Sequence, residues 1–210
     1  MKKIFLNNDT FYYKGKLDNP INNRIFLSKL KSFYYNHPQY VMKRTTDEEM
    51  RRRVEGEKIG FRPHDQLMNS QISFDETRNI LNFTTNLLSQ EFNTSKDYVF
   101  ESWTLFANNS ESKNFFHIHE HVNYITNQWS LCYYVQMPNN LIGDEGKLKF
   151  KTSDNLETAI LPEESDLIIF PGNLLHTPVD TTKSTKERIV FCSNISLLQL
   201  GEIKTSKSIL

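Results

Sequence analysis

The sequence predicts a mainly β domain, a sandwich or jelly-roll barrel, supported by helices that come first in the chain. Up to about residue 96 the apolar side chains recur at helical spacing, and after about residue 97 they fall into short β-type runs. No helical pattern separates these runs, as a parallel sheet would require. With 210 residues, we expect a single domain over 1–210. It would comprise a mostly helical support region (1–96), a β core (97–200) and a loosely held tail (201–210).

Two amphipathic helices are predicted in the first part. Residues 19–35 begin with Asn19-Pro20 and carry an apolar stripe made of Ile21, Ile25, Phe26, Leu30 and Phe33. The other long helix starts at a capping box formed by Ser73 and Glu76. Its apolar stripe consists of Ile80, Phe83, Leu87, Leu88 and Phe92.

The segment between these helices carries weaker signals. A short helix is expected to start at Thr45 or Thr46 and to run through the basic triplet Arg51-Arg52-Arg53. A solvated helix face explains this triplet better than a site for an acidic substrate does. Residues 54–72 are expected to be irregular.

Six short β-type runs follow: Tyr98–Phe106, Phe115–Val122, Trp129–Met137, Lys147–Lys151, Asp166–Phe170 and Arg188–Leu198. The Lys147–Lys151 run alternates strictly, which indicates a strand with one solvated face. Cys132 and Cys192 lie inside two of the apolar runs. A secreted disulfide framework contains more cysteines, so we expect both to be reduced core residues.

Composition and charge exclude some functions. Lys plus Arg equals Asp plus Glu, at 25 each, so the formal net charge of zero predicts no binding to nucleic acid or anionic membranes. The apolar run after Lys2-Lys3 is too short for a signal peptide, and no segment approaches the ~20 apolar residues of a membrane span. We expect a soluble cytoplasmic protein that acts on peptides or small molecules. The sequence does not indicate its oligomeric state.

Four of the six histidines form a pattern that indicates a metal site, and we interpret it as an oxygenase site. On an extended Phe115–Val122 segment, His117, His119 and His121 share one face. Side chains two apart are separated by roughly 6.6 Å at Cα and can bind one ion, whereas those four apart are too distant without a bulge. The metal pair is therefore His117 with His119, or His119 with His121. The alternative is three histidines without a metal.

His176 and Arg188 complete the pattern. His176 follows a buried strand and a turn, where a rigid scaffold can hold a ligand. Arg188 shares its strand face with Val190, Cys192 and Asn194, and a charge there is costly unless it is paired. A carboxylate-bearing co-substrate would supply that partner with bidentate geometry. An ordinary salt bridge at a strand end is the alternative.

The stretch from Trp103 to about Leu198 resembles the iron(II)- and 2-oxoglutarate-dependent dioxygenases, most closely the small prolyl-hydroxylase-like and phage-encoded members. The resemblance rests on the order and spacing of several pieces. These are Trp103, His117-Ile118-His119, Ser130–Pro138, Gly146–Phe150, Asp166–Pro171, His176–Val179 and Arg188–Phe191.

This resemblance implies a double-stranded β-helix, which is a cupin-like jelly roll, with N-terminal helices packed on one side. It implies His117, His119 and His176 as ligands of iron(II), with His121 as the alternate to His117. Arg188 would bind the distal carboxylate of 2-oxoglutarate, and Tyr134 would donate a hydrogen bond to the same group. The implied activity is hydroxylation of a C–H bond with O2 as oxidant.

One feature departs from the family pattern. The usual triad has two histidines and one carboxylate, whereas the carboxylate position here holds His119 or His121. Glu120 is adjacent, but strand alternation turns it away unless the strand bulges. An all-histidine site also resembles those of cupin thiol dioxygenases and some zinc enzymes. The alternatives are therefore a cupin-type metal enzyme that does not use 2-oxoglutarate and a non-catalytic jelly-roll binding protein.

Overall fold

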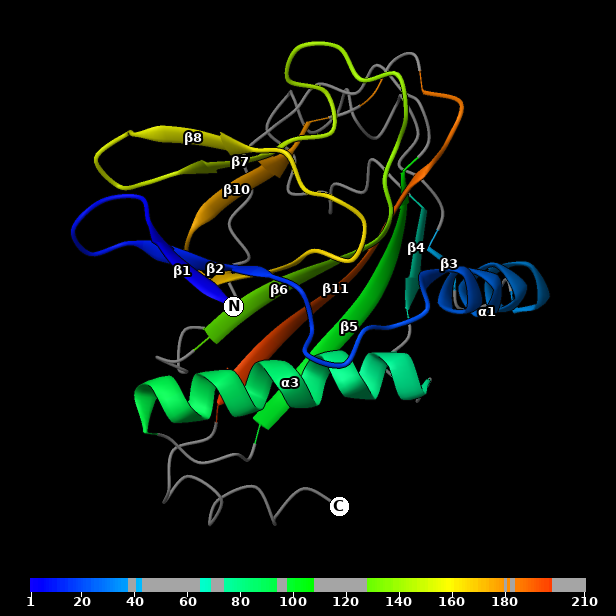
Figure 1. The fold of residues 1–210 in the computed structure, drawn as a ribbon, viewed down its shortest axis with the longest axis horizontal. Coiled ribbons are helices and arrows are strands. Elements are labelled where there is room, and N and C mark those ends of the chain that lie inside the picture. The colour runs from blue at the N-terminus through cyan, green and yellow to red at the C-terminus, as the bar shows by residue number, and fades with distance from the viewer. Residues whose placement is uncertain are drawn as a thin grey trace.

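The described part of the chain forms two antiparallel sheets and two helices (Figure 1). The computed structural model describes residues 1–37, 41–42, 65–68, 74–93, 98–107, 128–179, 181 and 184–197. In spatial order, the large sheet contains β1 (Lys2–Phe5), β2 (Phe11–Gly15), β9 (Leu167–Pro171), β6 (Gln128–Gln136), β11 (Arg188–Leu197), β5 (Tyr98–Ala107), β4 (Asp65–Met68) and β3 (Val41–Met42). The small sheet contains β10 (Leu175–Pro178), β7 (Leu148–Lys151) and β8 (Glu157–Ile160). The helices are α1 (Asn23–Asn36) and α3 (Asp75–Phe92).

The large sheet lies between two apolar cores. One core joins the sheet to the helices, through Phe26 and Leu30 of α1 and Ile80 and Leu88 of α3, all of which are fully buried. The other core joins the sheet to the small sheet and includes Tyr12, Tyr134, Leu148, Phe150, Ile168, Phe170, Val190 and Cys192. We call the volume between the two sheets the inter-sheet space.

The central strands are apolar on both faces because each face is covered. In β9, Leu167, Ile168, Ile169 and Phe170 are all fully buried. Alternate residues of this run face the helices and the small sheet, which explains its continuous hydrophobic pattern. By contrast, β7 alternates between buried and partly exposed positions, which agrees with the predicted solvated face.

Both helices begin later than their sequence patterns predict. Asn22 is the N-cap of α1, because its side chain accepts a hydrogen bond from the Ile25 N–H at 3.2 Å, so residues 19–22 are not helical. The N-cap of α3 is Phe74, and it makes no side-chain capping bond. Ser73 of the predicted capping box lies outside the described residues. Asp75 and Glu76 place negative charge in the first turn, where the helix dipole favours it.

Several short strands were not predicted from the sequence. The hairpin β1–β2 forms one edge of the large sheet, in the region expected to be mostly helical. Strand β4 lies within residues 54–72, which were expected to be irregular, and it pairs with β5. Strands β8 and β10 complete the small sheet. The helix predicted from Thr45 or Thr46 to Arg53 and the tail at 201–210 lie outside the described residues.

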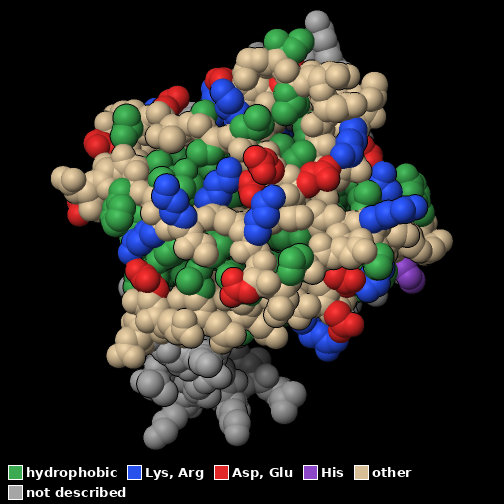
Figure 2. All heavy atoms as spheres, in the orientation of Figure 1, with side chains coloured by type: hydrophobic (Ala, Val, Ile, Leu, Met, Phe, Trp, Pro, Cys, Tyr) green, Lys and Arg blue, Asp and Glu red, His purple; other side chains and the backbone are tan. Residues whose placement is uncertain are grey.

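The surface carries mixed charge. On the face shown in Figure 2, Lys and Arg side chains are interspersed with Asp and Glu, in keeping with the zero net charge. On the outer side of β7, for example, Nζ of Lys149 lies 2.9 Å from a carboxylate oxygen of Asp144. Within the described part of the chain, neither helix has the length and apolar character needed to cross a membrane.

Candidate functional site

The inter-sheet space brings together three of the residues singled out by the sequence: Tyr134, His176 and Arg188. Tyr134 lies on β6 and Arg188 on β11, which are paired neighbours in the centre of the large sheet. His176 lies on β10 in the facing small sheet. All three are buried, with 4%, 6% and 4% of their surfaces exposed, respectively.

His176 points into the inter-sheet space and is held there by two contacts. Its ring packs edge-on against Phe170 of β9, with the ring centroids 4.7 Å apart. Its Nδ1 lies 2.8 Å from the carbonyl oxygen of Leu174. A carbonyl oxygen can only accept, so Nδ1 carries the proton and donates it. In this tautomer the lone pair is on Nε2, the arrangement in which histidine binds a metal through Nε2.

Arg188 reaches from the large sheet to the end of the strand that carries His176. Its Nη1 donates a hydrogen bond of 2.8 Å to the carbonyl oxygen of Val179, the residue that follows β10. Val179 is three residues after His176, so their Cα atoms are at most about 10 Å apart. Arg188 is therefore hydrogen-bonded just beyond the last residue of β10, and His176 is the second of the four residues of the same strand.

Tyr134 lies on the same inner face as Arg188. It is the register partner of Val190, and a β-bulge follows at Val135, because Gln136 pairs with Ile189. Burial raises the pKa of the Tyr134 phenol well above its ordinary value, and the nearby Arg188 guanidinium acts in the opposite direction. The phenol therefore stays protonated and can donate a hydrogen bond.

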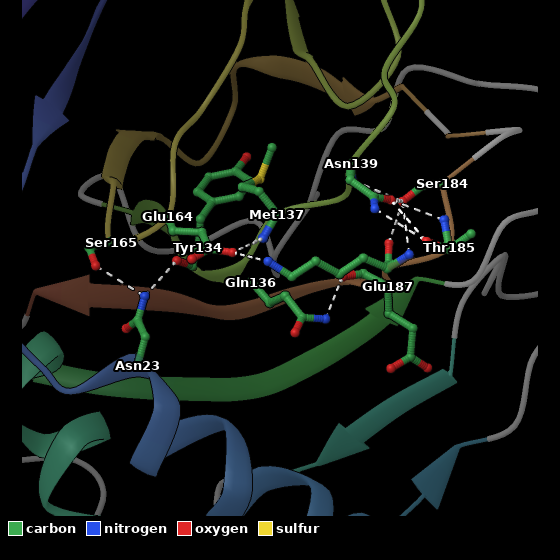
Figure 3. Close-up of polar contacts among 11 residues, drawn as sticks. Asn23, Tyr134, Gln136, Met137, Asn139, Glu164, Ser165, Ser184, Thr185 and Glu187 are labelled. Carbon is green, nitrogen blue, oxygen red and sulfur yellow. Dashed lines mark hydrogen bonds and ion pairs between the residues drawn. The ribbon is translucent and has the colours of Figure 1, made fainter.

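A polar network fixes the start of β11, and with it Arg188 (Figure 3). Gln136 Nε2 donates to the carbonyl oxygen of Glu187 at 2.8 Å, one residue before Arg188. The Asn139 side chain accepts from the Thr185 N–H at 3.0 Å and from Ser184 Oγ at 2.8 Å. These bonds connect the segment after β6 to the segment before β11. The backbone at Arg188 is therefore held in a fixed position.

The remaining predicted ligands are not described. His117, His119 and His121, with the strand predicted at Phe115–Val122, lie outside the described residues. Among the residues that the structure describes, no group of three or more His, Cys, Asp or Glu side chains is arranged to hold a metal. Of the proposed histidine ligands, His176 is the one that lies within the described residues.

Sequence reasoning missed the aromatic surroundings of His176. The Phe150 ring lies 5.1 Å from Phe170 and 5.2 Å from Tyr12, centroid to centroid, so these rings form a continuous wall beside the imidazole. The Val179 carbonyl was also missed, because backbone acceptors leave no sequence signal. The alternation of the Arg188–Leu198 run did indicate that Arg188, Val190 and Cys192 share a face.

Comparison with known proteins gives structural matches only. No protein-family model matches the chain, and no curated protein matches it. A prolyl-4-hydroxylase of Pseudomonas putida superposes with a TM-score of 0.63 at 11% identity, over 89% of this chain and 92% of that one. The non-heme alpha-ketoglutarate-dependent carbocyclase SnoK from nogalamycin biosynthesis gives 0.63 at 8% identity, over 88% and 79%. HygX from Streptomyces hygroscopicus, a structure with iron bound, gives 0.56 at 9% identity, over 89% and 82%.

These matches identify the fold. Because the identities are low, the similarity lies in the path of the chain rather than in the sequence. The two facing antiparallel sheets form a double-stranded β-helix with helices on one side, as in 2-oxoglutarate-dependent oxygenases. The predicted fold class is confirmed.

Proposed function

We propose that the chain is an iron(II)- and 2-oxoglutarate-dependent oxygenase that hydroxylates a C–H bond of a small molecule or a peptide. The observation that carries this proposal is that Arg188 is hydrogen-bonded to the end of the short strand β10 that also carries His176, inside a double-stranded β-helix. The superposed structures include a hydroxylase, an alpha-ketoglutarate-dependent enzyme and a protein with iron bound, which supports the same class of chemistry.

The surroundings of His176 fit a metal ligand. The Nδ1–H bond to Leu174 orients the ring and makes Nε2 the donor atom, as outer-shell hydrogen bonds do for metal-bound histidines. Packing against Phe170 restricts the ring further. His117 and His119 would supply the other imidazoles, with His121 as the alternate to His117. When bound, the iron would supply oxygen activation coupled to the oxidative decarboxylation of 2-oxoglutarate.

Arg188 and Tyr134 fit the binding of a dicarboxylate. A guanidinium presents its N–H donors in a planar fork that matches a carboxylate, and Arg188 is buried, where such pairing is strong. The protonated Tyr134 phenol would donate to the same carboxylate. The Val179 carbonyl holds the guanidinium at the end of β10, so the far end of the co-substrate would be fixed relative to His176.

The aromatic wall would exclude water from one side of the site. Phe150 and Phe170 are fully buried, and Tyr12 is 3% exposed. Such a wall lowers the local dielectric around the buried His176 and protects reactive groups from solvent. The chain's own contribution to the reaction would therefore be orientation of the co-substrate and exclusion of water.

Turnover of 2-oxoglutarate tests the proposal. The full chain is incubated with iron(II), ascorbate, O2 and a panel of peptides and small molecules, and succinate is measured. We expect succinate release that depends on iron and rises with one class of substrate. Activity that needs a metal but not 2-oxoglutarate, and is unchanged in Arg188→Ala, would support a cupin-type enzyme instead. No stoichiometric iron in protein purified and reconstituted without oxygen would support a non-catalytic binding protein.

A further inference from the structure

The two cysteines of the chain face each other across the two central strands of the large sheet. Cys132 on β6 and Cys192 on β11 are register partners, although they lie 60 residues apart in the sequence. Their Sγ atoms are 3.9 Å apart, and both residues are free thiols. The chain has only these two cysteines, so neither has another intramolecular disulfide partner.

The backbone geometry suits a disulfide bond. Directly opposed residues of an antiparallel pair have Cα atoms about 4.5–5.5 Å apart. Disulfides span Cα separations of about 4.4–6.8 Å, so the strands already lie at the right distance. Closing the sulfur atoms from 3.9 Å to a bond of about 2.05 Å then requires side-chain rotation and little backbone movement.

The two thiols differ in exposure. Cys132 is half-buried, whereas Cys192 is 5% exposed and packs in the inter-sheet core beside Val190. The hydrogen bond to Cys132, together with burial, raises the pKa of the Cys192 thiol. Cys132 is therefore the residue that an oxidant from solvent would reach first, with Cys192 positioned to react with it afterwards.

We propose that Cys132 and Cys192 form a reversible cross-strand disulfide when hydrogen peroxide oxidises the protein. In the first step the sulfur of Cys132 attacks one peroxide oxygen, the O–O bond breaks, and the leaving hydroxide takes a proton to become water. This leaves a sulfenic acid on Cys132. In the second step the sulfur of Cys192 attacks that sulfur, the S–O bond breaks, and the hydroxyl leaves as water with the thiol proton. Both thiols are oxidised by two electrons in total, and one peroxide is reduced.

The bond would join the strands on which Tyr134 and Arg188 lie. Cys132 is two residues before Tyr134 on the same face of β6, and Cys192 is four residues after Arg188 on the same face of β11. The closed loop would contain the whole small sheet, including His176. Oxidation would therefore link β6 and β11 covalently, close to the positions from which Tyr134 and Arg188 face the inter-sheet space.

The test uses the full chain without iron or 2-oxoglutarate, so its outcome does not depend on the proposed oxygenase activity. Protein reduced and freed of metal with a chelator is treated with hydrogen peroxide and quenched. Remaining thiols are alkylated in denaturant, and peptides are analysed by mass spectrometry without reduction. We expect a linked pair of peptides containing Cys132 and Cys192, an intact mass lower by about 2 Da, and recovery of both thiols after reduction.

Two single variants provide matched controls. In Cys132→Ala and Cys192→Ala the linked peptides cannot form, and the remaining thiol should stay alkylatable or be oxidised further to sulfinic acid. In the unmodified sequence, two thiols that remain fully alkylatable after peroxide treatment would overturn the proposal. Separate sulfinic acids on the two cysteines, or disulfides only between two copies of the chain, would overturn it equally. The mass analysis of the unmodified protein tests the disulfide proposal even if one of the variants folds poorly.

Discussion

Replacing Arg188 by methionine should weaken the binding of 2-oxoglutarate strongly while leaving the fold intact. Arg188 is 4% exposed, so the proposed carboxylate pair would be almost fully desolvated. Removing one partner of a buried, hydrogen-bonded charge pair costs about 2–5 kcal/mol. With about 1.4 kcal/mol per factor of ten, the Kd for 2-oxoglutarate should rise by at least ~30-fold. Arg188→Lys keeps the charge but loses the planar fork, so its Kd for 2-oxoglutarate should lie between that of the unmodified protein and that of Arg188→Met.

Isothermal titration calorimetry of 2-oxoglutarate into the metal-loaded protein measures this effect. The variant also loses the bond to the Val179 carbonyl, worth about 1.5–3 kcal/mol of stability for a charged donor, so the unfolding temperature must be recorded in parallel. Lys149→Met is the matched control, because it removes one positive charge from the outer side of β7, where Lys149 pairs with Asp144. Equal Kd values for Arg188→Met and Lys149→Met, with both proteins folded, would refute the assignment of Arg188.

Three further outcomes are expected. Tyr134→Phe should raise the Kd for 2-oxoglutarate by about tenfold or more, since a hydrogen bond to a charged group contributes ~1.5–3 kcal/mol. An unchanged Kd in the same titration would refute the assignment of Tyr134 to the 2-oxoglutarate site. Phe150→Ala should lower the free energy of unfolding by about 3–5 kcal/mol in urea, because Phe150 is fully buried, whereas Leu156→Ala, at a position 47% exposed, should change it by no more than ~0.5 kcal/mol. Hydrogen bonds from Lys147 and Lys149 lower the pKa of Asp144 from 3.8 to about 2, so its stabilising effect is fully present above pH 3.8 and is lost as the pH falls through about 2. Acid unfolding curves should therefore be shallower for Asp144→Asn than for the unmodified protein, and identical curves would contradict this assignment.

Long apolar runs were predictable from the sequence because burial on both faces removes polar residues. Strands β6, β9 and β11 show this, and their predicted bounds agree with the structure within one or two residues. Strand β2 was missed although Phe11-Tyr12-Tyr13 is aromatic, because Tyr12 packs between the sheets and Tyr13 packs on the helix side. Consecutive buried residues give no alternating pattern.

The candidate site was predictable where it depends on alternation within a strand. The sequence alone placed Arg188 on one face with Val190 and Cys192, and the structure has this arrangement. It did not show which strands are neighbours. The pairing of Cys132 with Cys192 and the contact of Arg188 with Val179 depend on strand order and register, which local patterns do not encode.

Linked binding of iron and 2-oxoglutarate to the full chain, measured by anaerobic equilibrium dialysis, tests the shared site most directly. If His176 and Arg188 serve one centre, the chain should bind one iron(II) per molecule, and each ligand should tighten the binding of the other by the same factor. His176→Ala should abolish the iron binding, whereas Arg188→Met should still bind iron and should bind 2-oxoglutarate at least ~30-fold more weakly. Iron binding that does not respond to 2-oxoglutarate, or that persists unchanged in His176→Ala, would contradict the account.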